Sequence, residues 1–318
     1  MKYPVKPDVP AVQTNGLTRT YASLTALQSL NLDVHRGDLF GFIGSNGAGK
    51  TTTLRILSTF LTPSSGTAEV LGYDVVKESD AVRHIIGYMP DFFGVYRDMV
   101  VWEYLDFFGA CYQIGSSQRD QTVKDVLELV GLSEKRDQLI GALSRGMQQR
   151  LGLARVLIHD PELLLLDEPA SGLDPRARVE MMAILTELQN MGKTIIISSH
   201  ILSELQALCN RVAIIEKGVL KYCGDIEGVG QDMVSQRQFR VACSADLEPM
   251  LTTFMEIPNI SMPVIEKGRI KFTVEDNEVD PATILKALIA AGVPVRDFHQ
   301  EEISLEKVFM NYTSGETQ

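Results

Sequence analysis

The sequence predicts an α/β fold built around a phosphate-binding loop, followed by a smaller α+β unit. Short apolar runs alternate with helical patterns from Val12 to Gly224, which is typical of a sheet covered by helices. Within this alternation, Gly44–Thr51 matches the pattern G-x-x-x-x-G-K-[ST] in full. After Gly230 the pattern changes to alternating apolar and polar residues. We therefore expect two domains in the 318 residues, at 1–228 and 229–318.

Eight segments of the first domain have the length and composition of strands. They are Val12–Thr18, Leu30–His35, Leu39–Ile43, Thr67–Leu71, Leu163–Asp167, Thr194–Ser198, Arg211–Glu216 and Val219–Cys223. From about residue 88 to 160, three helical patterns replace them. These are Val101–Gln113, Ser117–Val130 and Ser144–Ile158. The simplest account is a helical subdomain inserted into the α/β core.

The phosphate-binding loop has a buried strand before it and a helix, Thr51–Leu61, after it. Its glycines let the backbone N–H groups point inward at phosphate oxygens, and the helix dipole faces the anion. Lys50 adds a positive charge for the β- and γ-phosphates, and the Thr51 hydroxyl is suited to Mg²⁺. The alternative is a glycine-rich turn that binds no ligand.

Two carboxylates end the apolar strand Leu163–Asp167. Asp167 is placed to hold Mg²⁺ directly or through water, and Glu168 to act as a general base on an attacking water. The alternative is a pair of solvated acids at a strand end.

Ser144 is a natural N-cap for the helix that follows it. Its N–H groups and hydroxyl suit an anion, but a plain capped helix would carry the same residues. A straight helix from Ser144 to Ile158 would put this terminus roughly 20 Å from the Asp167 strand. Unless the chain folds back, this terminus is poorly placed for its own nucleotide and could serve the nucleotide of a neighbouring molecule instead.

The second domain alternates strands and helices in the order β-α-β-β-α-β. Phe239–Cys243 and Ile270–Val274 alternate apolar and polar residues, as half-buried strands do. Asp280 and Pro281 form an N-cap and first-turn pair for a helix through Ala291. This order predicts a ferredoxin-like arrangement. A last helix would carry Leu305, Val308, Phe309 and Tyr312.

Composition excludes several classes of protein. The net charge of −11 argues against a nucleic-acid partner, because phosphate neutralisation needs a basic surface. The longest apolar runs are of strand length, far short of the ~20 residues of a membrane span. No secretion signal opens the chain, and the four cysteines form no C-x-x-C pair, so we expect reduced thiols and a cytoplasmic protein.

Taken together, these motifs resemble the ATPase subunits of ATP-binding cassette (ABC) transporters in order and spacing. They are Gly44–Thr51, Leu143–Arg150, Leu163–Glu168, Ser171–Asp174 and His200. The resemblance covers about two-thirds of the chain and implies the P-loop NTPase fold of an ABC cassette. It further implies hydrolysis of ATP with Mg²⁺ in a head-to-tail homodimer or heterodimer. Two ATP molecules would lie at its interface, each closed by the other subunit's Ser144.

The resemblance assigns a role to each matching residue. The ATP phosphates would bind to Gly44, Ser45, Asn46, Gly47, Ala48, Gly49, Lys50, Thr51 and Thr52. Asp167 resembles the magnesium-site acid, Glu168 the catalytic base and His200 the histidine at the γ-phosphate. Tyr21 resembles the aromatic residue that stacks on adenine, and Asp174 the residue that links the two sites. The second copy would contribute Ser144, Arg145, Gly146 and Met147. Outside this context, Tyr21 could be an ordinary surface aromatic and His200 a structural histidine.

Three positions depart from the family pattern. Asp91 stands where the family usually carries a glutamine. Its carboxylate is a harder magnesium ligand than an amide, but it is shorter and repels the γ-phosphate. Asp91 therefore either reaches the metal through water or caps the next segment. Arg145 and Met147 replace a glycine and a glutamine, and Arg145 could either face a phosphate or be solvated.

A separate transmembrane permease is the partner that the resemblance implies. Nine of the 22 aromatic residues lie between Tyr88 and Tyr112. Most should form the core of the helical subdomain, and those left exposed could anchor a partner, with Phe92 and Phe93 as candidates. The tail Glu302–Phe309 resembles subunits paired with ABC-2-type export permeases. The protein would then lie on the cytoplasmic face of the plasma membrane.

Two other functions remain open on sequence grounds. One is a soluble ABC-class ATPase that acts on the ribosome or on DNA, which the acidic charge disfavours. The other is a binding-only regulator that has lost hydrolysis, for which Asp91 is the main argument and Glu168 and His200 are the arguments against.

Overall fold

The computed structural model describes residues 3–4, 6, 8–22, 24–92, 94–226, 237–244, 246–274 and 279–300. It forms two compact units, Met1–Ile226 and Glu227–Gln318, which are described separately below. Among the described residues, every helix is too short or too polar to cross a membrane. Phe93 and the tail helix predicted around Leu305–Tyr312 lie outside the described residues.

The first unit contains a six-stranded sheet in the order β11-β10-β4-β9-β8-β7. These strands are β4 (Leu39–Ile43), β7 (Ile86–Met89), β8 (Leu163–Asp167), β9 (Thr194–Ser199), β10 (Arg211–Glu216) and β11 (Val219–Asp225). Five of them are parallel, and β11 pairs antiparallel with β10 as the predicted hairpin. Because the carboxyl ends of parallel strands share one edge, the residues after β4, β8 and β9 are brought together there.

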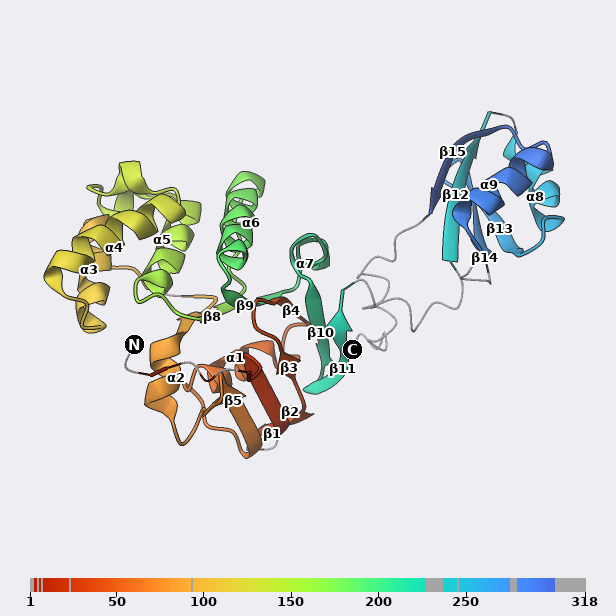
Figure 1. Cartoon of the computed structure of the whole chain (residues 1–318). Helices are drawn as coiled ribbons and strands as arrows, with labels where there is room; N and C mark the ends of the chain where they lie inside the picture. The colour runs from red at the N-terminus through yellow and green to blue at the C-terminus, as the bar shows by residue number, and fades with distance from the viewer. Residues whose placement is uncertain are drawn as a thin grey trace. The chain divides into compact units, whose positions relative to one another are not determined.

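A second, antiparallel sheet packs against this one through helix α1 (Lys50–Leu57). It has the order β2-β1-β5-β6, with β3 paired to β1. Its strands are β1 (Val12–Tyr21), β2 (Leu24–Leu30), β3 (Asp33–Val34), β5 (Ser65–Val70) and β6 (Tyr73–Asp74). Helices α6 (Pro175–Asn190) and α7 (Leu202–Leu208) contact the six-stranded sheet on its other side (Figure 1).

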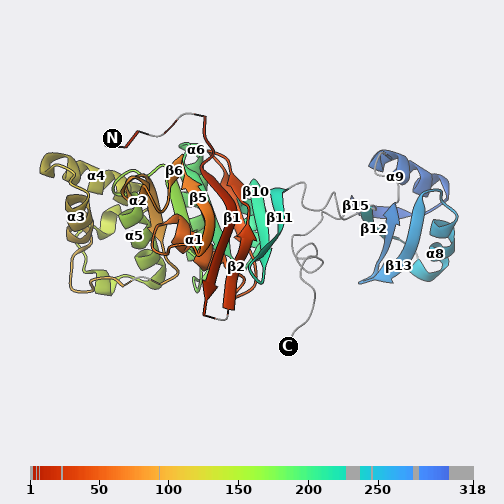
Figure 2. The same ribbon diagram turned by 90° about the horizontal axis from the view of Figure 1, so that it is seen from below.

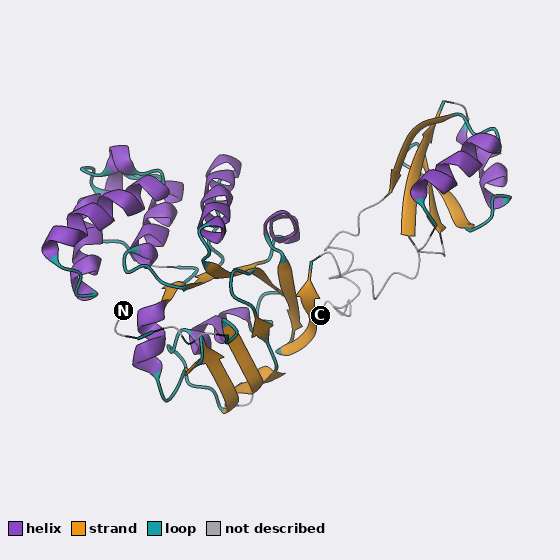
Figure 3. Ribbon diagram, in the orientation of Figure 1, coloured by secondary structure: helices purple, strands orange, loops and turns teal. Residues whose placement is uncertain are grey.

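The helical subdomain is confirmed as a separate block of helices (Figure 3). It contains α3 (Val101–Cys111), α4 (Ser116–Leu129) and α5 (Arg145–Leu157), and follows the short helix α2 (Ser79–Ile85) and β7. Helix α5 joins the block to the core because it contacts α3, α4, α6 and β7. Figures 1 and 2 both place α3 and α4 at the end of the unit away from β10 and β11.

Two predicted elements of this unit were clearly wrong in their bounds, and several others differ by one to three residues. The strand predicted at Leu30–His35 is replaced by β2, which ends at Leu30, and by the two-residue β3. The turn before β2 was missed because Ala22, and not glycine, adopts the positive φ of 47° there. The helix predicted to reach Leu61 ends at Leu57, and Thr59 turns the chain with a φ of 66°.

The second unit has the predicted β-α-β-β-α-β order over its described residues. Its elements are β12 (Arg237–Cys243), α8 (Leu247–Met255), β13 (Ile260–Glu266), β14 (Arg269–Val274), α9 (Pro281–Ala290) and β15 (Val295–Gln300). The sheet order is β13-β14-β12-β15, and all neighbours are antiparallel. This is the ferredoxin-like topology. Phe239, Phe254 and Phe272 are fully buried at its centre, and Asp280 accepts a hydrogen bond from the Ala282 N–H as the N-cap of α9.

Candidate nucleotide-binding site

The loop between β4 and α1 has the conformation that an anion site needs. The five residues of β4 are all buried, and the exposed residues Ser45, Asn46 and Gly47 follow at the top of the sheet. Gly49, with a φ of 113°, is the N-cap of α1 and leaves the first N–H groups of the helix without a side-chain cap. These N–H groups are free to bind phosphate oxygens, and Thr51 and Thr52 lie half-buried in the same turn.

Lys50 reaches back over this loop toward the two acids at the end of β8, Asp167 and Glu168. Its Nζ donates to the carbonyl oxygens of Gly44 (2.7 Å) and Ser45 (3.3 Å), and lies 3.9 Å from Glu168 Oε1. Burial lowers the pKa of Lys50 from its ordinary value, and the charges of Glu168 and Asp167 partly offset that effect. An anionic ligand here would add a partner for this buried ammonium group.

Asp167 is fully buried, and only one of its carboxylate oxygens is satisfied. Oδ1 accepts a hydrogen bond of 2.6 Å from the Ser198 hydroxyl, whose oxygen in turn accepts from the Glu168 N–H at 2.9 Å. Oδ2 is buried and has no hydrogen-bond partner among the described residues. An orphaned carboxylate oxygen beside a phosphate loop fits a hard cation or its water, and Mg²⁺ takes only one or two protein ligands beside substrate phosphates.

Glu168 stands between a lysine and a histidine. Its Oε2 lies 2.7 Å from Nδ1 of His200, on the side away from the Lys50 contact. The backbone of Glu168 has a φ of 51°, an uncommon conformation for this residue, which is held by its N–H bonds to Ser198. The arrangement can hold the carboxylate in one orientation toward a water molecule.

Tyr21, which the sequence predicts to stack on adenine, lies in the β1–β2 hairpin. The β1–β2 hairpin passes the loop, because a Cβ on Gly49 would lie 2.8 Å from the Ala26 carbonyl oxygen. Tyr21 ends β1 opposite Leu24 and is 41% exposed. The Arg19 guanidinium lies 4.6 Å from the centre of its ring, so one stacking partner is already present.

The structure brings the start of α5 next to the start of α6. Ser144 caps α5 by accepting from the Met147 N–H at 3.3 Å, and Asp174 caps α6 by accepting from the Ala177 N–H at 2.9 Å. Gly146 is required where the helices touch, because a Cβ there would lie 2.7 Å from the Cβ of Ala177. Arg145 donates to the Ser171 carbonyl oxygen of its own chain at 3.3 Å.

Asp91 uses its carboxylate locally in this structure. It is exposed, and its Oδ1 accepts a hydrogen bond of 2.8 Å from the N–H of the next residue, Phe92. The sequence allowed two roles for Asp91, a metal contact through water or a cap of the next segment, and this hydrogen bond is of the capping kind.

Two residues of the site were missed by sequence reasoning. Ser198 joins Asp167 to the Glu168 backbone, and its position two residues before His200 was the available signal. Glu204 on α7 lies 2.9 Å from Arg178 Nε, and burial raises its pKa although the Arg178 charge opposes this. A glutamate in a short amphipathic helix gives no comparable signal in the sequence.

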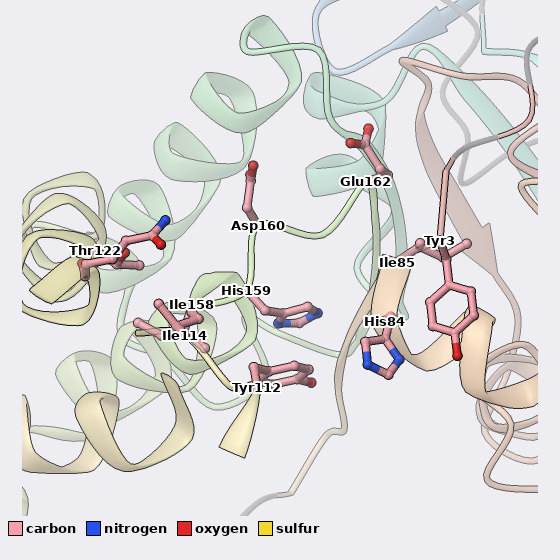
Figure 4. Close-up of a pocket in the computed structure, with 11 residues that line it drawn as sticks. Tyr3, His84, Ile85, Tyr112, Ile114, Thr122, Ile158, His159, Asp160 and Glu162 are labelled. Carbon is pink, nitrogen blue, oxygen red and sulfur yellow. The ribbon is translucent and has the colours of Figure 1, made fainter. Parts of the chain in front are cut away.

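A separate cavity of about 260 Å³ lies between α2, α4 and the chain segments that follow α3 and α5, lined in part by Tyr3, His84, Tyr112 and His159 (Figure 4). The rings of Tyr112 and His159 are stacked, 3.8 Å apart and nearly parallel. Burial lowers the pKa of His159 to about 4, although the imidazole contacts the Ile86 carbonyl oxygen at 2.9 Å. The phosphate loop contributes no residue to this cavity.

Two protein-family models match the chain. The family described as "ABC transporter" matches residues 27–171, and "ATP-binding protein DrrA1-3-like, C-terminal domain" matches residues 231–313. Among solved structures, cbiO1 from Clostridium perfringens, part of the ABC transporter complex cbiONQ, has a TM-score of 0.64 and 26% identity. That match covers 71% of this chain and 92% of the solved one.

Curated relatives are similar over different lengths. An uncharacterized ABC transporter ATP-binding protein of Synechocystis is 39% identical over 210 residues, which are 65% of this chain. The match spans only 59% of the Synechocystis protein's length. The bacitracin transport ATP-binding protein BcrA of Bacillus licheniformis is 34% identical over 320 residues, or 96% of this chain and 98% of BcrA. Because this likeness runs through both units, the chain belongs to the family of ABC transporter ATP-binding proteins.

Proposed function

We propose that this protein hydrolyses ATP and thereby powers a separate transmembrane permease. The observation that carries the proposal is the position of Glu168, 3.9 Å from Nζ of Lys50 and 2.7 Å from Nδ1 of His200, next to the orphaned oxygen of Asp167. A lysine for the phosphates, a metal-binding acid and an oriented base are the groups that phosphoryl transfer to water requires.

In the proposed reaction, the loop N–H groups and Lys50 hold the β- and γ-phosphates. Thr51 and Asp167 would hold Mg²⁺, with Asp91 reaching it through water. The metal ion would neutralise charge on the phosphates. Glu168 accepts a proton from the attacking water, while His200 fixes its carboxylate and contacts the γ-phosphate. Tyr21 would stack on adenine.

We further propose that two copies, identical or paralogous, close head to tail around two ATP molecules. Each copy would present Ser144, Gly146 and Met147 to the other's nucleotide, and Asp174 would connect the two sites. The exposed cap at Ser144, at the N-terminus of α5, supports this role because its N–H groups can still bind an anion.

Hydrolysis is tested with Glu168→Gln in the purified protein. We expect ATP turnover to fall by about 10²-fold or more, since general-base catalysis contributes 10²–10⁴-fold, while ATP binding is kept. Glu162→Gln, at the opposite end of β8, is the matched control and should keep full activity. Equal turnover in wild type and Glu168→Gln would refute the assignment, and absence of turnover in the wild type would favour the binding-only regulator.

Exposed aromatic side chains support docking of the permease at the helical subdomain. Phe92, Tyr96 and Phe107 are 84%, 56% and 46% exposed, whereas Tyr104 is buried. We propose an ABC-2-type export permease, because BcrA is a transport protein and the second unit matches the DrrA-like family. The protein would bind to the cytoplasmic face of the plasma membrane, and we expect no nucleic-acid partner.

The docking proposal is tested by extraction of the complex from membranes. Phe92→Ala should reduce co-purification of the permease and its stimulation of ATP turnover. Met191→Ala, at another exposed apolar residue just after α6, should change neither. Unchanged co-purification and stimulation in Phe92→Ala would count against this surface.

We assign residues 1–228 to the ATP-binding domain and 229–318 to an accessory domain. The division into compact units after Ile226, and the start of the second family match at residue 231, support this boundary.

A further inference from the structure

Arg145 is engaged within its own chain, at the loop between β8 and α6. Its Nη2 donates to the Ser171 carbonyl oxygen at 3.3 Å. The guanidinium also lies flat against Gly172, because a Cβ added there would stand 2.4 Å from Nη2 and 2.5 Å from Cζ. Gly172 has a φ of 66°, a backbone conformation that favours glycine.

The loop that Arg145 contacts begins at the catalytic carboxylate. The Ser171 N–H donates to the Glu168 carbonyl oxygen at 3.0 Å, and the Leu173 N–H donates to the Ala170 carbonyl oxygen at 3.3 Å. These two hydrogen bonds close tight turns, so the backbone between Glu168 and Leu173 has little freedom to move. A displacement of the Ser171 carbonyl therefore changes the position of the Glu168 backbone, which already has a positive φ.

The other end of this connection is the N-terminus of α5. Arg145 is the first residue of α5 and directly follows its cap, Ser144. Gly146, one residue further, touches Ala177 of α6. The side chain of Arg145 thus connects two places in one chain. One is the N-terminus of α5, which is proposed to face a second copy, and the other is the loop that follows Glu168.

We propose that Arg145 is a positioning residue that couples the Ser144 terminus of one chain to Glu168 of the same chain. Binding of Ser144 to the nucleotide of a second copy would then be transmitted to the first copy's own catalytic carboxylate. The inference rests on the proposed ATPase dimer. It differs from a role of Arg145 opposite a phosphate of the second copy, because that role requires the guanidinium to leave Ser171.

The contact itself can be tested without nucleotide and without a dimer. Amide hydrogen exchange is measured on the full-length protein over the peptide 169–174. Arg145→Ala should exchange about tenfold faster there, the effect of losing one hydrogen bond from a charged donor. Arg176→Ala is the matched control, since that exposed arginine near the same loop pairs with Glu180 among the described residues. Unchanged exchange in Arg145→Ala would overturn the inference, whatever the fate of the ATPase proposal.

Mixed dimers then decide between the two roles of Arg145. One differently tagged copy carries Glu168→Gln, so that only the site with the other copy's Glu168 can hydrolyse ATP. We expect Arg145→Ala to lower turnover about tenfold when it is in the copy with intact Glu168, and little when it is in the Glu168→Gln copy. The reverse pattern, or equal effects, would overturn the coupling role. A reference dimer without turnover would instead refute the proposed function, and the exchange measurement would still decide the inference.

Discussion

Ser198 contacts both acidic residues of the site, Asp167 and Glu168. Its hydroxyl donates to Asp167 and accepts from the Glu168 N–H, so one residue holds both the buried carboxylate and the backbone of the proposed base. Because a hydroxyl has one proton, this pair of bonds also fixes its rotamer. The orphaned Asp167 Oδ2 is then the oxygen available to a metal ion.

We predict that Ser198→Ala lowers both stability and magnesium affinity. The change leaves a second buried oxygen of Asp167 without a partner, which costs about 1–3 kcal/mol of unfolding free energy. Urea unfolding and magnesium titration of ATP turnover measure the two effects. Ser199→Ala is the control, because that hydroxyl accepts from the Ile201 N–H and not from Glu168. Wild-type stability in Ser198→Ala would show that the bond has no net effect.

At this scale the sequence predicted residue types better than their contacts. Gly49, Lys50 and Glu168 could be found because the phosphate-loop pattern and an apolar strand ending in acids are local signals. The contact of Arg145 with Ser171 could not, because the two residues are 26 positions apart and meet only when α5 packs on α6. Arg145 was expected either at a phosphate or in solvent. In the structure it is exposed and also donates a hydrogen bond to the Ser171 carbonyl oxygen.

Helix α5 connects the helical subdomain to α6 and to the six-stranded sheet. Its N-terminus carries Ser144 and touches α6, and its C-terminal half packs on β7, where a Cβ on Gly87 would lie 2.4 Å from Val156. The helix itself was predictable from its N-cap and apolar stripe. Its tertiary contacts were not, because small residues such as Gly146 and Ala177 mark a close helix contact only once the partner helix is known.

We predict that Gly146→Ala destabilises the first unit by separating α5 from α6. The added methyl group would lie 2.7 Å from the Cβ of Ala177, and overpacking of this kind costs about 1–3 kcal/mol. Urea unfolding measures the loss. Gly115→Ala is the matched control, because no atom lies within 4 Å of a Cβ there. A loss no larger than that of Gly115→Ala would mean that the helices separate without cost.

The C-terminal end of α5 predicts a pH dependence through His159. In the folded protein its pKa is lowered to about 4 from 6.5, so the unfolded chain binds a proton at higher pH than the folded one. Stability is therefore complete above pH 6.5 and falls as the pH drops toward 4, by about 2–3 kcal/mol at pH 4.5. In His159→Phe, which keeps the ring stacked on Tyr112, the difference in unfolding free energy between pH 7 and 4.5 should shrink by that amount. An equal pH dependence in both proteins would contradict the burial of a neutral imidazole.

For the whole molecule, the main question is whether its two units are energetically separate. Each has its own hydrophobic cluster, one around Phe40 and Leu54 and the other around Phe239 and Phe272. The change of pattern after Gly230 predicted a separate α+β unit because alternation with period two differs visibly from the buried parallel strands before it. Its ferredoxin-like strand order followed from the order of elements, since few topologies accommodate that order.

We predict that Phe272→Ala weakens the second unit and leaves the first unchanged. Phe272 is fully buried, and its truncation costs about 3–5 kcal/mol, most of what a small unit can supply. Hydrogen exchange in increasing urea reports on peptides of each unit separately. Residues 237–274 should unfold at a lower urea concentration, whereas β8 and β9 should keep their wild-type unfolding midpoint. The protein should also keep its basal ATP turnover. Leu185→Ala, a fully buried residue of α6, should give the converse result. If Phe272→Ala instead moved both midpoints together, the units would fold as one body. The second unit would then contribute directly to the stability of the nucleotide site. Stabilisation of the first unit, and not regulation or assembly, would be the first role to test for this DrrA-like unit.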